Sequence, residues 1–163
     1  MKIQDAEKLA KDHIKNILGD GWKFRWDRSK KRFGCCHWNM KLITLSKELV
    51  ELNEVGEVED TILHEIAHAL AGARHGHDKV WKQKCIEIGA RPEMYYSTKI
   101  VTQPEPRYLL ICNNCGRVKG AYKKRNCSCG KCSGGVYNPN YRMDCIPFKD
   151  CPSKYRTLYY LSR

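Results

Sequence analysis

Apolar residues recur at the period of a helix near the start of the chain. Between residues 2 and 18 the pattern runs through Ile3, Ala6, Leu9, Ala10, His13, Ile14 and Ile17. Residues spaced in this way share one helical face, which predicts an amphipathic helix packed against a core. Gly19 and Gly21 end the pattern, because glycine is unfavourable inside a helix.

Three short runs after this helix have the residue types of β-strands. The runs are Trp22–Asp27, Arg32–Trp38 and Lys41–Leu45. Turn-forming residues separate them, so we expect a three-stranded antiparallel meander. Ser46 follows the last run and is a candidate N-cap for a short helix that ends at Leu52.

A second apolar segment begins at about residue 58 and is apolar nearly all round, which predicts a buried helix. Its apolar positions are Ile62, Leu63, Ile66, Ala67 and Leu70. Asp78 is a candidate N-cap for the next helix, which should end at Gly89. Together these elements predict an α+β domain over residues 1–95.

The segment that follows has no periodicity and contains several prolines. We interpret residues 96–106 as a linker to a second, smaller domain over residues 107–163. In that domain Arg107–Ile111 and Arg117–Tyr122 are expected to form antiparallel strands.

The buried helix carries the arrangement His64-Glu65-x-x-His68. Each helical residue advances roughly 100°, so the two histidines lie about 40° apart on one face and can bind one metal ion. Glu65 lies to the side, where a general base can reach a water molecule at an open coordination position. A chance occurrence is disfavoured, because each unpaired polar group in a buried helix costs on the order of 1–3 kcal/mol.

A catalytic zinc site needs a third protein ligand, and two histidines follow closely. A longer zinc motif would require glycine at position 71 and histidine at position 74, where this chain has Ala71 and Arg74. His77 directly precedes the predicted cap Asp78, which would fix its position, and we favour it as the ligand. His75 is the alternative.

The cysteines of the second domain have the spacing of a structural zinc site. Cys112 and Cys115 form one pair, Cys129 and Cys132 form the other, and the pattern is C-x2-C-x13-C-x2-C. Two such pairs predict a four-cysteine zinc ribbon, and hence two zinc ions per chain, one catalytic and one structural. Cys127 could replace Cys129 in the set.

Charge is unevenly divided between the two domains. Residues 1–106 hold 18 Lys and Arg against 16 Asp and Glu, a net +2, whereas residues 107–163 hold 12 against 2, a net +10. Such an excess, interleaved with aromatic residues, predicts binding to nucleic acid. The candidate contacts, in and beside the loop between the two cysteine pairs, are Lys119, Tyr122, Lys123, Lys124 and Arg125.

The first residues lack an apolar signal core, and no run approaches the roughly 20 apolar residues of a membrane span. Paired cysteine spacing in a basic chain is more typical of zinc than of disulfides. We therefore expect an intracellular, reducing location, cytoplasmic and either nucleoid-associated or nuclear, no membrane partner, and a monomer.

Several motifs together resemble the SprT-like metalloproteases, the family of the Spartan-type proteases that act on DNA–protein crosslinks. The motifs are Gly21-Trp22-x-Phe24-x-Trp26, Arg32-x-Gly34-x-Cys36, Ile43-x-Leu45-Ser46, Leu63-His64-Glu65-x-x-His68 and Gly76-His77-x-x-x-Trp81. The resemblance covers residues from about 20 to 95 and continues into the cysteine-rich tail. It implies a zincin-like first domain, His77 as the third zinc ligand and a zinc ribbon after the protease.

For function, the resemblance implies a zinc-dependent endopeptidase that binds DNA, cleaves DNA-associated or crosslinked proteins, and cleaves itself when DNA is present. A second hypothesis is a DNA-binding zinc protein or regulator whose histidine site is only structural. Glu65 distinguishes the two, since a structural site has no use for a carboxylate beside an open metal position. Its presence favours the enzyme.

Overall fold

The structure, a computed structural model, describes residues 1–94 and 101–162. It contains two compact units, Met1–Pro104 and Glu105–Arg163. Val101 and Thr102 fall within the segment expected to be the linker, yet both are attached to the first unit. Val101 is buried in its core, and the Asn53 side chain bonds both the N–H and the C=O of Thr102.

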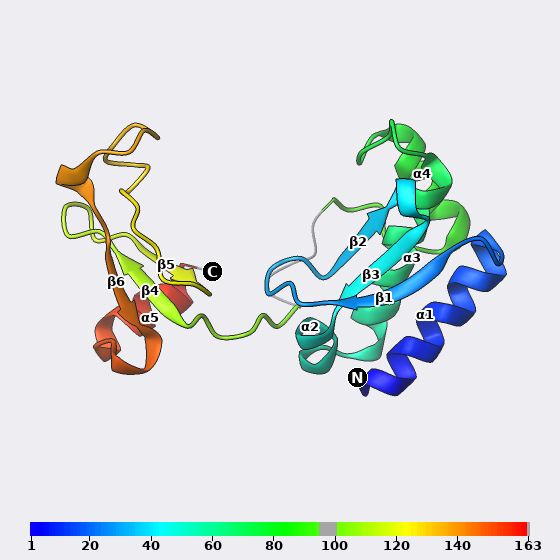
Figure 1. Cartoon of the computed structure of the whole chain (residues 1–163), viewed down its shortest axis with the longest axis horizontal. Coiled ribbons are helices and arrows are strands. Elements are labelled where there is room, and N and C mark those ends of the chain that lie inside the picture. Colours follow the sequence, from blue (N-terminus) through cyan, green and yellow to red (C-terminus); the bar gives the residue numbers. More distant parts are fainter. Residues whose placement is uncertain (95–100, 163) are drawn as a thin grey trace. The chain divides into compact units, whose positions relative to one another are not determined.

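The first unit is α+β, as expected, and its elements are shown in Figure 1. The helices are α1 (Ile3–Leu18), α2 (Lys47–Leu52), α3 (Val55–Ala71) and α4 (Lys79–Ile88), and the strands are β1 (Lys23–Asp27), β2 (Gly34–His37) and β3 (Leu42–Ser46). Ser46 caps α2 as predicted, because its side chain accepts from the Leu49 N–H. Helix α3 begins three residues earlier than the apolar pattern indicated.

The order of the strands corrects one detail of the expected fold. The sheet has the order β1-β3-β2, and β1 runs parallel to β3, so the strands do not form a meander. All five residues of β3 are buried, whereas β1 and β2 are partly exposed. The strand that is buried on both faces therefore takes the centre of the sheet, which adjacency in sequence does not reveal.

Helices α1 and α3 cover one face of this sheet (Figure 1). Their contacts with the sheet form the main core, which includes Ala6, Ala10, Ile14, Ile43, Leu45, Ile62 and Ile66. A smaller cluster joins α3 to α4 through Trp81 and Cys85. The core thus fixes α3 between the sheet on one side and α4 on the other.

The second unit is built on a three-stranded antiparallel sheet with the order β5-β4-β6. Strands β4 (Tyr108–Ile111) and β5 (Val118–Ala121) were predicted, whereas β6 (Asp144–Pro147) and helix α5 (Ser153–Leu161) were not. In α5, Tyr159 lies against the sheet at Gly120, where a Cβ atom would come within 2.9 Å of its ring. In the described parts of both units, no helix is long and apolar enough to span a bilayer.

Candidate metal centre and cysteine cluster

Three histidines converge at one end of the α3–α4 pair. His64 and His68 lie one turn apart on α3, and His77 comes from the loop before α4. The Nε2 atom of His77 lies 3.2 Å from that of His64 and 3.1 Å from that of His68. In a tetrahedral site with metal–nitrogen bonds of about 2.0–2.1 Å, ligand nitrogens lie roughly 3.3 Å apart. The three side chains therefore fit a zinc ion.

Trp81 supports this group from behind. Its ring centroid lies 4.7, 5.2 and 4.6 Å from those of His64, His68 and His77, and it is fully buried. Burial holds the pKa of both His64 and His68 down at about 4 and also lowers that of His77. Neutral imidazoles keep a lone pair for a metal, which is the form that ligation requires.

Asp78 separates the two candidate third ligands. Its Oδ1 accepts from the N–H groups of Val80 and Trp81, so it caps α4 as predicted. Its Oδ2 lies 2.8 Å from Nδ1 of His75. Among the described residues, the histidine group with metal-binding geometry contains His77 and not His75.

Glu65 lies between the two α3 histidines in sequence but faces the sheet. Only 7 % of its surface is exposed, and its side chain passes so close to Gly34 of β2 that a Cβ there would lie 2.6 Å from Cγ. Burial raises the pKa of Glu65 to about 8, opposed by the Cys36 backbone amide and the Arg32 charge. A carboxylate with raised proton affinity is suited to act as a general base.

A cleft of about 1360 Å³ gives access to this site. Its walls come from β2, from α3 and from the segment Arg91–Met94, and both the three histidines and Glu65 line it. Arg91 attaches this last segment to α3 by two ion pairs, since its guanidinium lies 2.7 Å from the Glu57 carboxylate and 2.8 Å from the Asp60 carboxylate. The sequence also offers Tyr95 and Tyr96 as candidates for an oxyanion contact, and both lie outside the described residues.

The four predicted cysteine ligands meet in the second unit. The Sγ atoms of Cys112 and Cys132 are 3.8 Å apart, and those of Cys115 and Cys129 are 3.7 Å apart. Tetrahedral zinc–sulfur bonds of about 2.3 Å place sulfurs roughly 3.8 Å apart. The donor set therefore fits a structural zinc ion.

Backbone turns shape this cysteine cluster. Gly116, in a left-handed conformation, closes the first turn by donating to the Cys112 carbonyl. The Cys132 amide closes the second turn and lowers the pKa of Cys129 to about 6.

The remaining cysteines lie elsewhere. Cys127 and Cys145 contact an apolar cluster beside the site, and Cys151 is buried beneath α5. Cys85 lies in the core of the first unit. Cys36 is near Glu65, and burial raises its pKa to about 12. In the described part of the chain, none of these joins a group of potential metal ligands.

The five candidate nucleic-acid contacts lie in two different places in the second unit. Lys119 lies exposed on β5, and Tyr122 and Lys123 follow that strand. Lys124 and Arg125 line a cavity of about 650 Å³ together with Arg142, which the sequence interpretation missed. Arg142 reaches this loop because the chain bridges from residue 142 to Ser128. A contact between residues so far apart in the sequence cannot be predicted from local sequence patterns.

Comparisons with known proteins found a family model and a solved structure that are similar to parts of this chain. The family model described as SprT-like family matches residues 3–101. A solved structure similar to this chain is the metallopeptidase zymogen abylysin of Pyrococcus abyssi, with 26% sequence identity and a TM-score of 0.42. That alignment covers 51% of this chain and 78% of the other. No curated protein matches the chain.

Proposed function

Because the chain belongs to the SprT-like family, we propose that it is a zinc-dependent endopeptidase that binds DNA and cleaves proteins associated with or crosslinked to DNA. Family membership and the histidine geometry support a zinc protease-type function. The observation that carries the proposal is the convergence of three histidine Nε2 atoms beside a buried glutamate in an open cleft.

In this proposal His64, His68 and His77 hold the catalytic zinc, and Cys112, Cys115, Cys129 and Cys132 hold the structural one. Bound zinc at the histidine site supplies a Lewis acid that polarises the scissile carbonyl and acidifies water. A carboxylate oxygen of Glu65 accepts the proton of the attacking water. The same oxygen then donates that proton to the leaving amine nitrogen, so Glu65 is again a carboxylate at the end of the cycle.

Substrate selection in the proposal comes from the second unit. Its net charge of +10 favours the phosphate backbone of DNA, so proteins fixed to DNA would be brought near the cleft. In this proposal the chain also cleaves itself in the presence of DNA, as its resemblance to the Spartan-type proteases implies.

The decisive experiment removes only the base. Glu65→Gln keeps the side-chain size and all three histidines, so zinc content and DNA binding should be retained. Loss of a general base typically lowers the rate by roughly 10²–10⁴-fold. Cleavage of a DNA-crosslinked protein, and self-cleavage with DNA, should become undetectable on a gel.

Glu51→Gln is the matched control, because Glu51 is an exposed carboxylate on α2, remote from the cleft lining. It should cleave like the wild type. If Glu65→Gln also cleaves at the wild-type rate, Glu65 is not the base. If even the wild type cleaves no protein with zinc and DNA present, a DNA-binding regulator is the better description.

A further inference from the structure

The small net charge of the first unit hides two segments of opposite sign. Residues 20–46, which contain the three strands, hold seven Lys and Arg and two Asp, a net +5. Residues 47–60, which form α2 and the start of α3, hold one Lys and six Asp and Glu, a net −5. The strands and the acidic helices thus differ by ten charges within one folded body.

Two cations of the strand segment point away from the helices, and two more lie at the ends of β1. In β1, Phe24 and Trp26 contact the main core, so the alternate residues Lys23 and Arg25 point the other way and are exposed. Lys41 lies beside Lys23, whose N–H donates to the Lys41 carbonyl. Arg28 follows at the other end of the strand. These four residues form the basic sheet face, which spans about 16 Å from Lys23 to Arg28.

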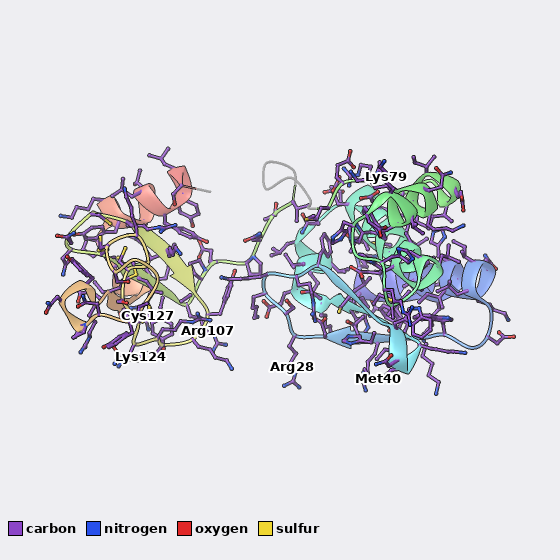
Figure 2. The ribbon with its side chains drawn as sticks, turned by 90° about the horizontal axis from the view of Figure 1, so that it is seen from above. Arg28, Met40, Lys79, Arg107, Lys124 and Cys127 are labelled. Atoms are coloured by element: carbon purple, nitrogen blue, oxygen red, sulfur yellow. The ribbon has the colours of Figure 1, made fainter. Side chains whose placement is uncertain are left out.

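The loop that carries Arg28 is held in place by hydrogen bonds. Asp27 Oδ1 accepts from the Ser29 N–H, and Ser29 Oγ accepts from the N–H groups of Lys31 and Arg32. Ser46 Oγ donates to the Ser29 carbonyl at 2.6 Å. Arg28 therefore projects from an ordered turn, on the side of the unit that also bears Met40 and away from Lys79 (Figure 2).

Nearby carboxylates do not neutralise this face. Lys30 pairs with Glu48, and Arg32 pairs with Asp27. Within residues 1–94 and 101–162, none of the four cations of the basic sheet face forms an ion pair. Charges on an edge strand can also serve to block strand pairing, but that role accounts for Lys23 and Arg25 and not for Arg28 and Lys41.

We propose that the basic sheet face is a second binding surface for the phosphate backbone of DNA, located on the protease unit itself. The inference rests on the proposed function for the identity of the partner. Its position is informative, because the neighbouring residues Lys31 and Arg32 line the catalytic cleft together with Glu65. DNA on this face lies beside the cleft, so a protein attached to that DNA is presented to the histidine site.

The test uses the full-length protein with zinc bound and labelled single-stranded and duplex oligonucleotides. The variant combines Lys23→Gln, Arg25→Gln and Arg28→Gln. Each lost phosphate contact should reduce the slope of log affinity against log salt by about 0.7 for single strands and 0.9 for duplex. The combined variant should therefore bind more weakly, with a slope shallower by roughly 2 to 3.

A matched control combines Lys8→Gln, Lys79→Gln and Lys82→Gln, which remove equal charge from exposed positions on α1 and α4. It should keep the wild-type slope. Equal slopes for all three proteins, or an equal loss in both variants, overturn the inference while leaving DNA binding by the second unit intact. A wild type that binds no oligonucleotide overturns the DNA part of the proposed function instead.

Folding is checked by zinc content and helical circular dichroism. Should the combined variant lose either, Arg28→Gln alone replaces it, because Arg28 lies in the loop outside the sheet. That single change should reduce the slope by about 1, and an unchanged slope would contradict the proposal.

Discussion

At Gly34 the missing side chain makes room for the Glu65 carboxyl group. A Cβ atom there would meet Glu65 Cγ at 2.6 Å and Oε1 at 2.8 Å, closer than real Cβ contacts. The glycine at position 34 therefore leaves space that the Glu65 side chain occupies. Position 34 thus controls where the proposed base can sit.

Gly34→Ala should displace Glu65 without touching a histidine. Misplacing a catalytic group by about 1 Å can lower the rate by on the order of 10²-fold, so proteolysis should fall by about that factor while zinc content stays constant. Gly56→Ala is the control, since nothing lies within 4 Å of a Cβ at that position. Equal activity of the two variants would show that Gly34 does not position the base.

The two neighbouring histidines should differ sharply in zinc binding. Wild-type protein should contain two zinc ions per chain by elemental analysis, and His77→Ala should remove most of the one held by histidines. His75→Ala should retain both, because His75 contacts Asp78 and not the histidine group. The reverse pattern would make His75 the ligand, and a wild type with a single ion would exclude the two-site arrangement.

The spacing of residues in the sequence predicted those parts of the two sites whose members lie close together in the sequence. His64, Glu65 and His68 share one helix, and each cysteine pair shares one turn, so the period of the backbone brings them together. Gly34 and Arg142 could not be found in this way. Their roles depend on contacts with segments about 30 and 17 residues distant, and only a glycine within a strand hinted at a close approach.

At the scale of elements, the cap of α4 links helix stability to the metal centre. Asp78 accepts two amide hydrogen bonds, and His77 directly precedes it. Asp78→Ala leaves these amides without a side-chain acceptor, so the Tm of the first unit should fall by roughly 4–8 °C and zinc affinity should decrease. Thermal melts and zinc titration would measure both.

Asp78→Ser is the informative companion to that variant. Serine caps helices nearly as well as aspartate, but it removes the carboxylate that contacts His75. Recovery of both Tm and zinc affinity in the serine variant is expected. If serine is no better than alanine, the His75 contact matters more than the cap.

Helices and strands were predictable where residues at their ends are typical of helix caps or turns. Ser46, Asp78 and Gly89 mark helix ends by cap chemistry, and the structure confirms all three. The parallel pairing of β1 with β3 was not predictable, because β3 is central owing to burial on both faces. Helix α5 was missed for a related reason: its face is fixed by Tyr159 against Gly120, a contact between distant positions.

For the whole molecule, most DNA affinity should reside in the second unit. Deleting residues 107–163 removes a net charge of +10. The affinity for DNA should therefore fall to the weak residual affinity of the basic sheet face. Fluorescence anisotropy at several salt concentrations should show a steep salt dependence for the full chain. Equal affinity with and without the tail, or a flat salt response, would show that the tail does not bind DNA.

The opposed charges of the first unit also act at a distance. With +5 on residues 20–46 and −5 on residues 47–60, charge is unevenly distributed over the unit, and an approaching polyanion is attracted to the strand segment before any contact forms. Rotation toward the strand side during approach raises the fraction of productive collisions. The association rate constant, and not only the affinity, should then decrease with ionic strength, since the field is screened over about 8 Å at physiological salt.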